Sequence, residues 1–444
     1  MIHNQGGIIS INFNDVKTWM GIIFIFTLLN TFFNSLCVAY GLPFPYSTFL
    51  ANSSDLHADL IKTAVSLLHQ YNIPNIHEWS PLYQDYFFHY PYGGFNVDVL
   101  EKNSFTLFHM PPLSVNLTIV LSKVILVTSA DTLVFFFYMT VIILLFYLST
   151  LFANNKKEVI FLSLTMLLSY PILLMLTRGY IYSLIIGILS IVLLFNVNKS
   201  NSSWLISIVL LSLIINLRPN AVILLALLFS YGFREGLKYS IFAIILSGLL
   251  FFSNLGIVQN IYPQYTLEHF SQGLKVYYQL YIIGHFGDSF NNSLYGLEKY
   301  FFTTISYLMV LSPQRYAKTL EFNTILGLGI TLFSIILFNR RKIDLYGFSF
   351  LIVLIYSLAF TIFSVYYLLI FFAFLLIPLK DNELQNSYFY KEVVILSSIT
   401  LIPKNYIFND ALSLESVVNP ILMLSVAILI IRKSLKNRRV GEEL

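Results

Sequence analysis

Long uninterrupted apolar runs, joined by polar connections, constrain this chain more than any other feature. Several runs approach the length of about 20 residues that crosses the roughly 30 Å hydrocarbon core of a bilayer. Only 11% of the 444 residues are charged and 57% are hydrophobic, whereas a soluble domain carries about 25% charged residues. Because the runs are continuous rather than alternating, helices are favoured over a transmembrane barrel. The sequence predicts an all-α polytopic membrane protein.

About twelve transmembrane helices are expected from these runs, several of them short enough to be tilted or broken. The segments are residues 19–40, 133–153, 159–176, 181–197, 204–217, 221–231, 239–257, 325–338, 345–363, 365–379, 393–402 and 420–431. The first segment is interpreted as a retained helix rather than a signal peptide. Only Lys17 lies close before it, and no small-residue cleavage site follows it.

The distribution of lysine and arginine orients the helices, because cytoplasmic connections carry an excess of both residues. With the N-terminus placed in the cytoplasm, most basic residues of the short connections and tails fall on that side. They are Lys17, Lys156, Lys157, Lys199, Arg234, Lys238, Arg340, Arg341, Lys342, Lys380, Lys391, Arg432, Lys433, Lys436, Arg438 and Arg439. Both termini are therefore expected to be cytoplasmic, in a plasma (inner) membrane.

This orientation leaves two large outer segments, residues 41–131 and 258–323, both rich in Tyr, Phe, His and Asn. The stretch 111–127 is expected to be an interfacial helix of the first segment, because counting it as a span would put Lys156 and Lys157 outside. The chain then divides into an N-terminal transmembrane module (1–257), the second outer loop (258–323) and C-terminal helices with a basic cytoplasmic tail (324–444). The outer face is the expected working face.

Several classes of function are disfavoured by composition. Cys37 is the single cysteine, so no internal disulfide and no thiolate cluster for a metal can form. The histidines show neither an HExxH pattern nor a closely spaced pair, which disfavours a zinc site. The sequence has no stripe of Lys and Arg on a soluble face, and a nucleic-acid partner is therefore disfavoured.

Two carboxylates lie at the start of a predicted helix in the first outer loop. Ser54 is a plausible N-cap, and Asp55 and Asp59 are then four residues apart on one helix face. Repulsion between them raises the proton affinity of at least one, which suits a general base or a ligand of a divalent cation. A capped, solvated amphipathic helix is the alternative interpretation.

Two arginines interrupt the apolar runs at their outer ends, against the positive-inside trend. Arg178 precedes Gly179, and Arg218 precedes the helix-breaking Pro219. An arginine at this depth costs free energy unless it is paired or meets an anion. The two arginines predict a phosphate site, the alternative being pairing with an outer aspartate or with a lipid phosphate.

Other outer residues are candidate substrate contacts. They are His109, Tyr180, Asn220 and Lys275. The aromatic residues of the first loop also fit an interfacial belt, and the spacing of the second loop ranks none of its residues.

The order of these elements resembles the GT-C class of membrane glycosyltransferases, which use polyprenyl-phosphate-linked sugars, and in pattern the bacterial family 87 of mannosyltransferase type. The matching elements are Asp59-Leu60 with Ala64, His109-Met110-Pro111-Pro112-Leu113, Arg178-Gly179-Tyr180 and Arg218-Pro219. They cover about residues 50–225, and the rest matches in hydropathy. Tyr180 stands where the family commonly has Asn.

The resemblance implies a GT-C-like fold and transfer of a sugar, with inversion, to a hydroxyl of a glycan or glycolipid acceptor on the extracytoplasmic face. It implies that Asp59 deprotonates the acceptor, that Asp55 orients or binds, and that Arg178 and Arg218 hold the leaving lipid phosphate. A divalent cation at Asp55 and Asp59 stays open. The alternatives are an O-antigen or capsule repeat-unit polymerase of the Wzy type, which would depend on later arginines such as Arg315, and a transporter of lipid-linked sugar.

Overall fold

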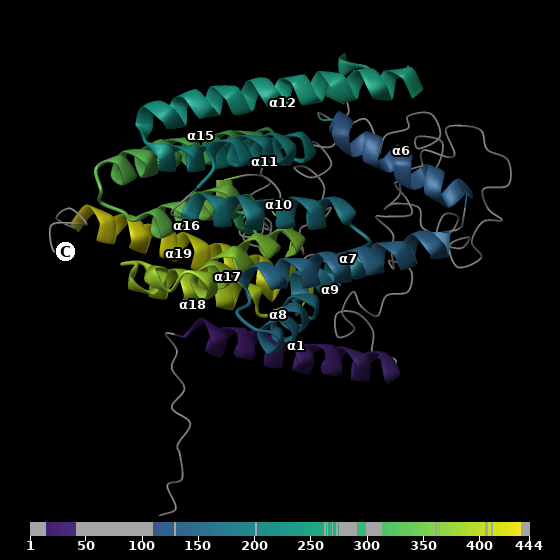
Figure 1. Cartoon of the computed structure of the whole chain (residues 1–444), viewed down its shortest axis with the longest axis horizontal. Coiled ribbons are helices and arrows are strands. Elements are labelled where there is room, and N and C mark those ends of the chain that lie inside the picture. Colours follow the sequence, from purple (N-terminus) through teal and green to yellow (C-terminus); the bar gives the residue numbers. More distant parts are fainter. Residues whose placement is uncertain are drawn as a thin grey trace, which may run out of the picture.

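The computed structural model describes residues 15–40, 110–127, 130–199, 202–261, 263, 265–268, 270–271, 274, 291–298, 313–359, 363, 365–404, 407–409 and 412–436. These residues are almost entirely helical, and their helices run roughly side by side along the long axis of the molecule (Figure 1). The predicted all-helical class is confirmed.

The elements follow the predicted apolar runs. In chain order they are α1 (Val16–Ala39), α6 (Pro112–Val127), α7 (Ala130–Phe152), α8 (Lys156–Leu167), α9 (Tyr170–Arg178), α10 (Ile181–Asn198), α11 (Trp204–Leu217), η4 (Pro219–Tyr231), α12 (Phe233–Ile261), α15 (Pro313–Asn339), α16 (Leu345–Ala359), η6 (Val365–Phe372), α17 (Ala373–Lys380), η7 (Asn382–Asn386), α18 (Tyr390–Leu401), β1 (Ile407–Asn409), β2 (Leu412–Ser413) and α19 (Leu414–Lys436). Elements η4, η6 and η7 are 3₁₀ helices, and β1 and β2 form a small antiparallel hairpin.

Within the described part of the chain, six helices are long and apolar enough to cross a membrane. They are α1, α7, α10, α12, α15 and α19. The number is seven if the pair α8 and α9 counts as one span. Two predicted spans, α11 and α16, are shorter apolar helices, and so is α6, which was expected to be interfacial. The architecture is therefore that of a membrane protein, with fewer full-length spans than the twelve apolar segments of the sequence.

One predicted span is corrected by the structure. Residues 159–176 are not one straight span, because α8 and α9 meet at a bend of 62°. Pro171 lies in the first turn of α9 and lacks the N–H that would continue the helix. The apolar part of α15 begins at Phe322, close to the predicted start of its span, and the outer position of residues 258–323 stays a prediction.

The centre of the molecule consists of α16, η6 and α17. Every residue of α16 from Tyr346 to Ala359 is buried, as expected for a helix that is apolar all round. Element η6 packs against α9 and α10, and α16 packs against α15, η4 and α19. The central helices are thereby screened from the surroundings on several sides.

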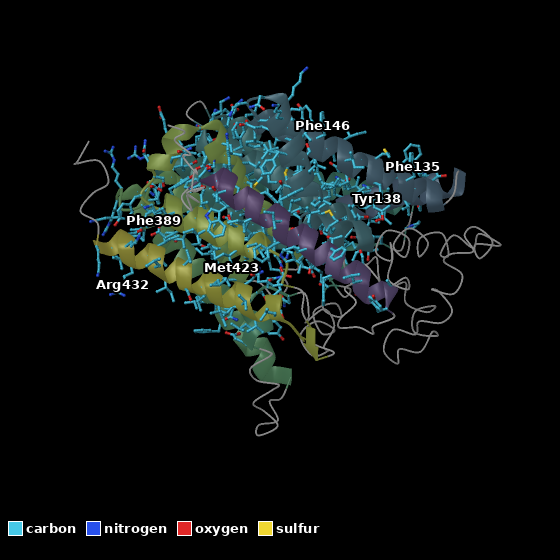
Figure 2. The ribbon with its side chains drawn as sticks, turned by 90° about the horizontal axis from the view of Figure 1, so that it is seen from below. Phe135, Tyr138, Phe146, Phe389, Met423 and Arg432 are labelled. Atoms are coloured by element: carbon cyan, nitrogen blue, oxygen red, sulfur yellow. The ribbon has the colours of Figure 1, made fainter. Side chains whose placement is uncertain are left out.

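The outer helices present apolar surface outward. In Figure 1, α12 runs along one edge and α1 along the opposite edge, and Figure 2 shows Phe135, Tyr138 and Phe146 along α7. Phe252 of α12 is 63% exposed, and α1 and α7 also carry exposed large apolar side chains. Surface of this kind on long helices is suited to contact with lipid chains.

Helix α12 packs on its neighbours through a stripe of small residues. The stripe consists of Gly236, Ser240, Ala243 and Ser247. Ser212 of α11 donates to the Ala243 carbonyl at 3.0 Å, and Asn216 donates to the Ser247 carbonyl and hydroxyl at 3.0 and 2.9 Å. Small residues let helix backbones approach, and the polar pairs then fix the register without exposing polar groups to lipid.

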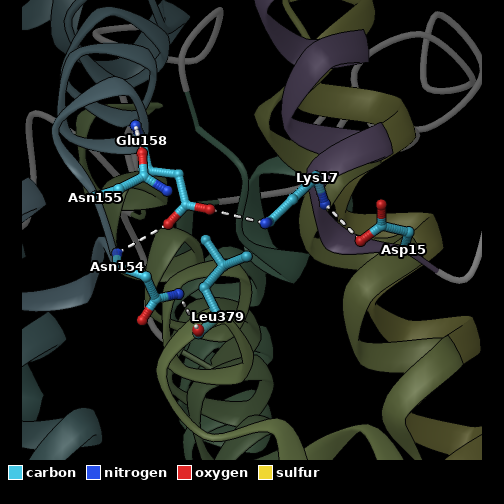
Figure 3. Close-up of polar contacts among 6 residues, drawn as sticks. All are labelled: Asp15, Lys17, Asn154, Asn155, Glu158 and Leu379. Atoms are coloured by element: carbon cyan, nitrogen blue, oxygen red, sulfur yellow. Dashed lines mark hydrogen bonds and ion pairs between the residues drawn. The ribbon is translucent and has the colours of Figure 1, made fainter.

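One end of the bundle, here called the basic end, is joined by polar contacts near the predicted cytoplasmic lysines. Figure 3 shows Lys17 of α1 paired with Glu158 of α8 at 2.8 Å, while Asn155 caps α8 at 3.0 Å. Lys433 of α19 pairs with Glu392 of α18, and Asp344 before α16 accepts from the Ser387 hydroxyl at 2.7 Å. The start of α1, the starts of α8, α16 and α18, and the end of α19 therefore lie together.

Candidate functional site

Arg178 is the last residue of α9. The helix ends because Gly179 adopts a left-handed conformation, with φ of 72°, and donates its N–H to the Met175 carbonyl at 2.8 Å. Tyr180 follows, and its ring lies edge-on to Tyr182 in the first turn of α10, 5.8 Å away between centroids. The predicted sharp turn between two helices is confirmed.

Arg218 lies at the junction of α11 and η4. Its N–H closes α11 on the Ile214 carbonyl at 2.8 Å, and Pro219 then begins η4. The side chain of Arg218 is 8% exposed, whereas the next polar residue, Asn220, is half-buried. The predicted break at Pro219 is present, but the arginine is more deeply enclosed than an outer headgroup position requires.

Three aromatic rings enclose the Arg218 guanidinium, and we call this arrangement the arginine cage. Its carbon Cζ lies 3.5 Å from the ring centroid of Tyr367 and 5.5 Å from those of Tyr356 and Phe363. These distances fall within the range of about 6 Å in which a cation is attracted to a ring face. The rings come from α16, from η6 and from the segment between them. The three ring faces stabilise the charge of Arg218 in this buried position.

A short segment of the second outer loop holds Phe363 in place. The N–H of Asn292 donates to the Phe363 carbonyl at 2.9 Å, and the Phe363 N–H donates to Asn291 Oδ1 at 3.0 Å. Asn292 Oδ1 in turn accepts from Asn419 of α19 at 2.9 Å. The arginine cage is thus connected by direct hydrogen bonds to the start of α19.

Two further charged residues lie at the ends of the last helices. Lys404 donates to the carbonyls of Ile399 and Ile402 at 2.5 and 2.7 Å, which closes the C-terminus of α18. Burial lowers the pKa of Lys404 to about 8, against an opposing effect of the charge of Glu415. Glu415, in the first turn of α19, is 1% exposed. The hairpin of β1 and β2 joins these two residues.

A carboxylate also lies in the segment that holds Phe363. Glu298 accepts from the amide of Asn323 at 2.7 Å. Burial raises the pKa of Glu298, and the Asn323 hydrogen bond opposes that effect. A carboxyl group with a raised pKa can serve as an acid or a base.

The start of α6 lies against the start of α10. The Tyr182 hydroxyl is hydrogen-bonded to Thr118 and donates to the Ser114 carbonyl at 3.1 Å, and the Tyr265 hydroxyl donates to the Met110 carbonyl. The structure therefore brings the Pro-Pro-Leu element and the Arg-Gly-Tyr turn, two of the predicted motifs, onto neighbouring helices.

The predicted site residues divide into two groups. Arg178 and Arg218 are both on elements that meet η6, since α9 packs against η6 and Tyr367 of η6 contacts Arg218. Asp55, Asp59, His109 and Lys275 lie outside the described residues. Among the described residues, no group of three His, Cys, Asp or Glu side chains is arranged to hold a metal ion. The proposed cation at Asp55 and Asp59 stays a prediction.

Sequence reasoning missed the partners of Arg218. Tyr356 and Tyr367 lie within continuous apolar runs, where nothing separates a ring that faces a cation from one that faces lipid. Asn291 and Asn292 lie in a polar stretch of the sequence in which no spacing distinguishes them from their neighbours. Glu415 gave the one usable signal, because it is an acid at the outer end of an apolar run.

No protein-family model, no curated protein and no solved structure matches this chain.

Proposed function

We propose that the protein is a glycosyltransferase that takes its sugar from a polyprenyl-phosphate donor. The observation that carries the proposal is the arginine cage. Arg218 is a buried cation that faces three aromatic rings at the junction of two helices, a placement that is costly for a guanidinium and is often found at anion sites. A phosphate of the donor would offset this cost, because Arg forms bidentate hydrogen bonds with phosphate oxygens.

The second arginine extends the same argument. Arg178 ends a helix that packs against η6, the element that carries Tyr367 of the cage. Two guanidinium groups on elements that share η6 suit a leaving group that develops negative charge as the sugar departs. A lipid phosphate is already a stable anion on leaving, so it needs cations more than it needs a general acid.

The chemistry of the acceptor is proposed from the sequence. Asp59, with Asp55 beside it, acts as the base that removes the proton from the acceptor hydroxyl. One base on the face opposite the leaving phosphate gives a single displacement with inversion at the sugar carbon. The acceptor is a hydroxyl of a glycan or glycolipid.

The orientation of the molecule follows from its charges. The basic end carries the lysines and arginines of the short connections, which favours its placement in the cytoplasm. The arginine cage lies where α11 ends and η4 begins, and it includes Tyr356 near the end of α16, whose start belongs to the basic end. The site is then extracytoplasmic and the lipid tail of the donor lies along the exposed apolar helices. Cysteine labelling tests this: Asp85→Cys should react with an impermeant reagent from outside, and Lys156→Cys should not.

The direct test is sugar transfer by the purified protein in lipid nanodiscs. Radiolabelled polyprenyl-phosphate sugars are supplied with glycolipid extracted from a strain that lacks the protein. The proposal expects transfer of one sugar residue, and the same residue should be missing from the surface polysaccharide of that strain. Loss of chain length with all residues retained would instead indicate a repeat-unit polymerase.

A second candidate function is transport of a lipid-linked sugar. It is favoured by one observation, the combination of buried charge with interrupted helices at Pro171 and Pro219. The same nanodisc assay separates the two functions. A transporter would move fluorescent lipid-linked sugar between leaflets of proteoliposomes and would form no glycosidic bond.

A further inference from the structure

A buried polar cluster lies one contact beyond the arginine cage. It consists of Asn292, Glu415 and Asn419, and we call it the Glu415 cluster. Glu415 and Asn419 are one turn apart on the same face of α19, and they are 1% and 0% exposed. The Asn419 amide donates to Asn292 Oδ1 at 2.9 Å and to Glu415 Oε1 at 3.3 Å. Its donors are therefore both used.

The acceptors of this cluster are not all used. In the part of the chain that the structure describes, Glu415 Oε2 and Asn419 Oδ1 are buried and have no hydrogen-bond partner. A buried polar atom without a partner costs about 1–3 kcal/mol, and more when it carries charge. Two such oxygens one helical turn apart point to a ligand that supplies hydrogen-bond donors.

The charge of Lys404 limits what this ligand can be. Its ammonium group is fixed by the carbonyls at the end of α18 and is near enough to interact electrostatically with Glu415. A metal cation at Glu415 would be repelled by this ammonium. Neutral O–H groups, which need acceptors and no counter-charge, fit the cluster best.

The position of the cluster links it to the arginine cage. Asn292, which accepts from Asn419, also donates to the backbone of Phe363, and the Phe363 ring faces Arg218. A sugar phosphate carries hydroxyl groups and a phosphate, the two kinds of group for which Glu415 with Asn419 and Arg218 are suited.

We propose that Glu415 and Asn419 bind hydroxyl groups of the sugar whose phosphate meets Arg218. The identification of the ligand as a sugar phosphate rests on the proposed function, whereas hydroxyl binding at Glu415 rests on the two unpartnered oxygens. The assignment adds a site in the C-terminal half of the chain, beyond the region of motif resemblance.

Binding of the methyl glycosides of glucose, galactose, mannose and N-acetylglucosamine tests the proposal. Saturation-transfer NMR is measured on the full-length protein in a detergent without a sugar head group. At least one glycoside should bind the natural protein, and Glu415→Gln should weaken it about tenfold, the loss expected for one hydrogen bond to a charged group. Asn419→Ala provides a second variant if Glu415→Gln does not fold.

The matched control is Glu392→Gln, which changes a carboxylate of α18 that pairs with Lys433 at the basic end. It should bind the glycosides as the natural protein does. Failure of all four glycosides to bind, or equal binding by Glu415→Gln and Asn419→Ala, overturns the proposal. If the protein binds a glycoside but transfers no sugar, the hydroxyl site stands and the transferase proposal is wrong. If it transfers sugar but binds no glycoside in this way, the transferase proposal stands and the hydroxyl site is wrong.

Discussion

The basic end and the arginine cage use charge in opposite ways. At the basic end, Lys17 and Glu158 form a direct ion pair in which the lysine side chain is 57% exposed. At the cage, Arg218 is 8% exposed and faces aromatic rings. Exposed pairs contribute little free energy and tolerate change. A buried cation among rings is costly to keep and is therefore the better marker of function.

The carboxylates differ in the same way. Glu158 and Glu392 each have a lysine partner. Glu415 accepts from an amide on one oxygen, and among the described residues its other oxygen has no hydrogen-bond partner, although the charge of Lys404 acts on the group. The ion pairs of the basic end thus hold helices together, whereas the Glu415 cluster contains buried oxygens that have no hydrogen-bond partner among the described residues.

The largest effect is expected for Asp59→Asn. Removing a general base costs about 10²–10⁴-fold in rate, so sugar transfer should fall by that factor while the amount of protein in the membrane stays normal. The measurement is initial transfer rate in nanodiscs. The control is Glu298→Gln, a half-buried carboxylate held by Asn323, which should keep most of the activity. If Glu298→Gln lost more activity than Asp59→Asn, the base would be Glu298 and not Asp59.

The next effect is expected at the cage. Arg218→Ala removes a charged hydrogen-bonding group and should weaken donor binding by about 100-fold. Arg218→Lys keeps the charge but loses the planar guanidinium, so its donor affinity should lie between that of the natural protein and that of Arg218→Ala. Arg432→Ala, at the basic end, serves as the control. Donor titrations that show equal losses for Arg218→Ala and Arg432→Ala would remove the distinction between the regions.

A smaller effect, on stability, is expected where α12 meets η4. A Cβ atom on Gly236 would lie 2.6 Å from the backbone Cα of Phe229, whereas one on Gly248 of the same helix meets nothing within 4 Å. Overpacking of this kind costs about 1–3 kcal/mol. Gly236→Leu should therefore lower the thermal unfolding midpoint and Gly248→Leu should not, as measured by tryptophan fluorescence in detergent.

The smallest effect is expected for Lys17→Ala. The variant breaks the exposed pair with Glu158 at the basic end and should change stability by less than about 1 kcal/mol. Sugar transfer should be unchanged, because this pair joins helices at the basic end and takes no part in the proposed phosphate site. A large loss of activity in this variant would show that the basic end is more than a structural joint.

The sequence predicted the helices because apolar runs and helix-ending residues are local signals. Gly179 and Pro219 end α9 and α11 as expected. The bend at Pro171 was missed because the apolar run continues through it. The arginines at the cage end were found from their charge alone, since a basic residue within an apolar region stands out in the sequence.

The surroundings of Arg218 could not be predicted. Tyr356 and Tyr367 lie more than 130 positions further along the chain, and contacts at such separation depend on how the helices pack. Asn291 and Asn292 act through backbone groups of Phe363, which no side-chain pattern reveals. The unused oxygens of Glu415 and Asn419 follow from burial, which is a property of the assembled bundle.

Binding of polyprenyl phosphate to the purified protein is the decisive measurement for the role of Arg218. Titration in nanodiscs compares the natural protein with Arg218→Ala and with the basic-end variant Lys433→Ala. We expect saturable binding that Arg218→Ala weakens by about 100-fold and that Lys433→Ala leaves unchanged. Equal affinity of the natural protein and Arg218→Ala for this lipid would rule out a phosphate site at Arg218.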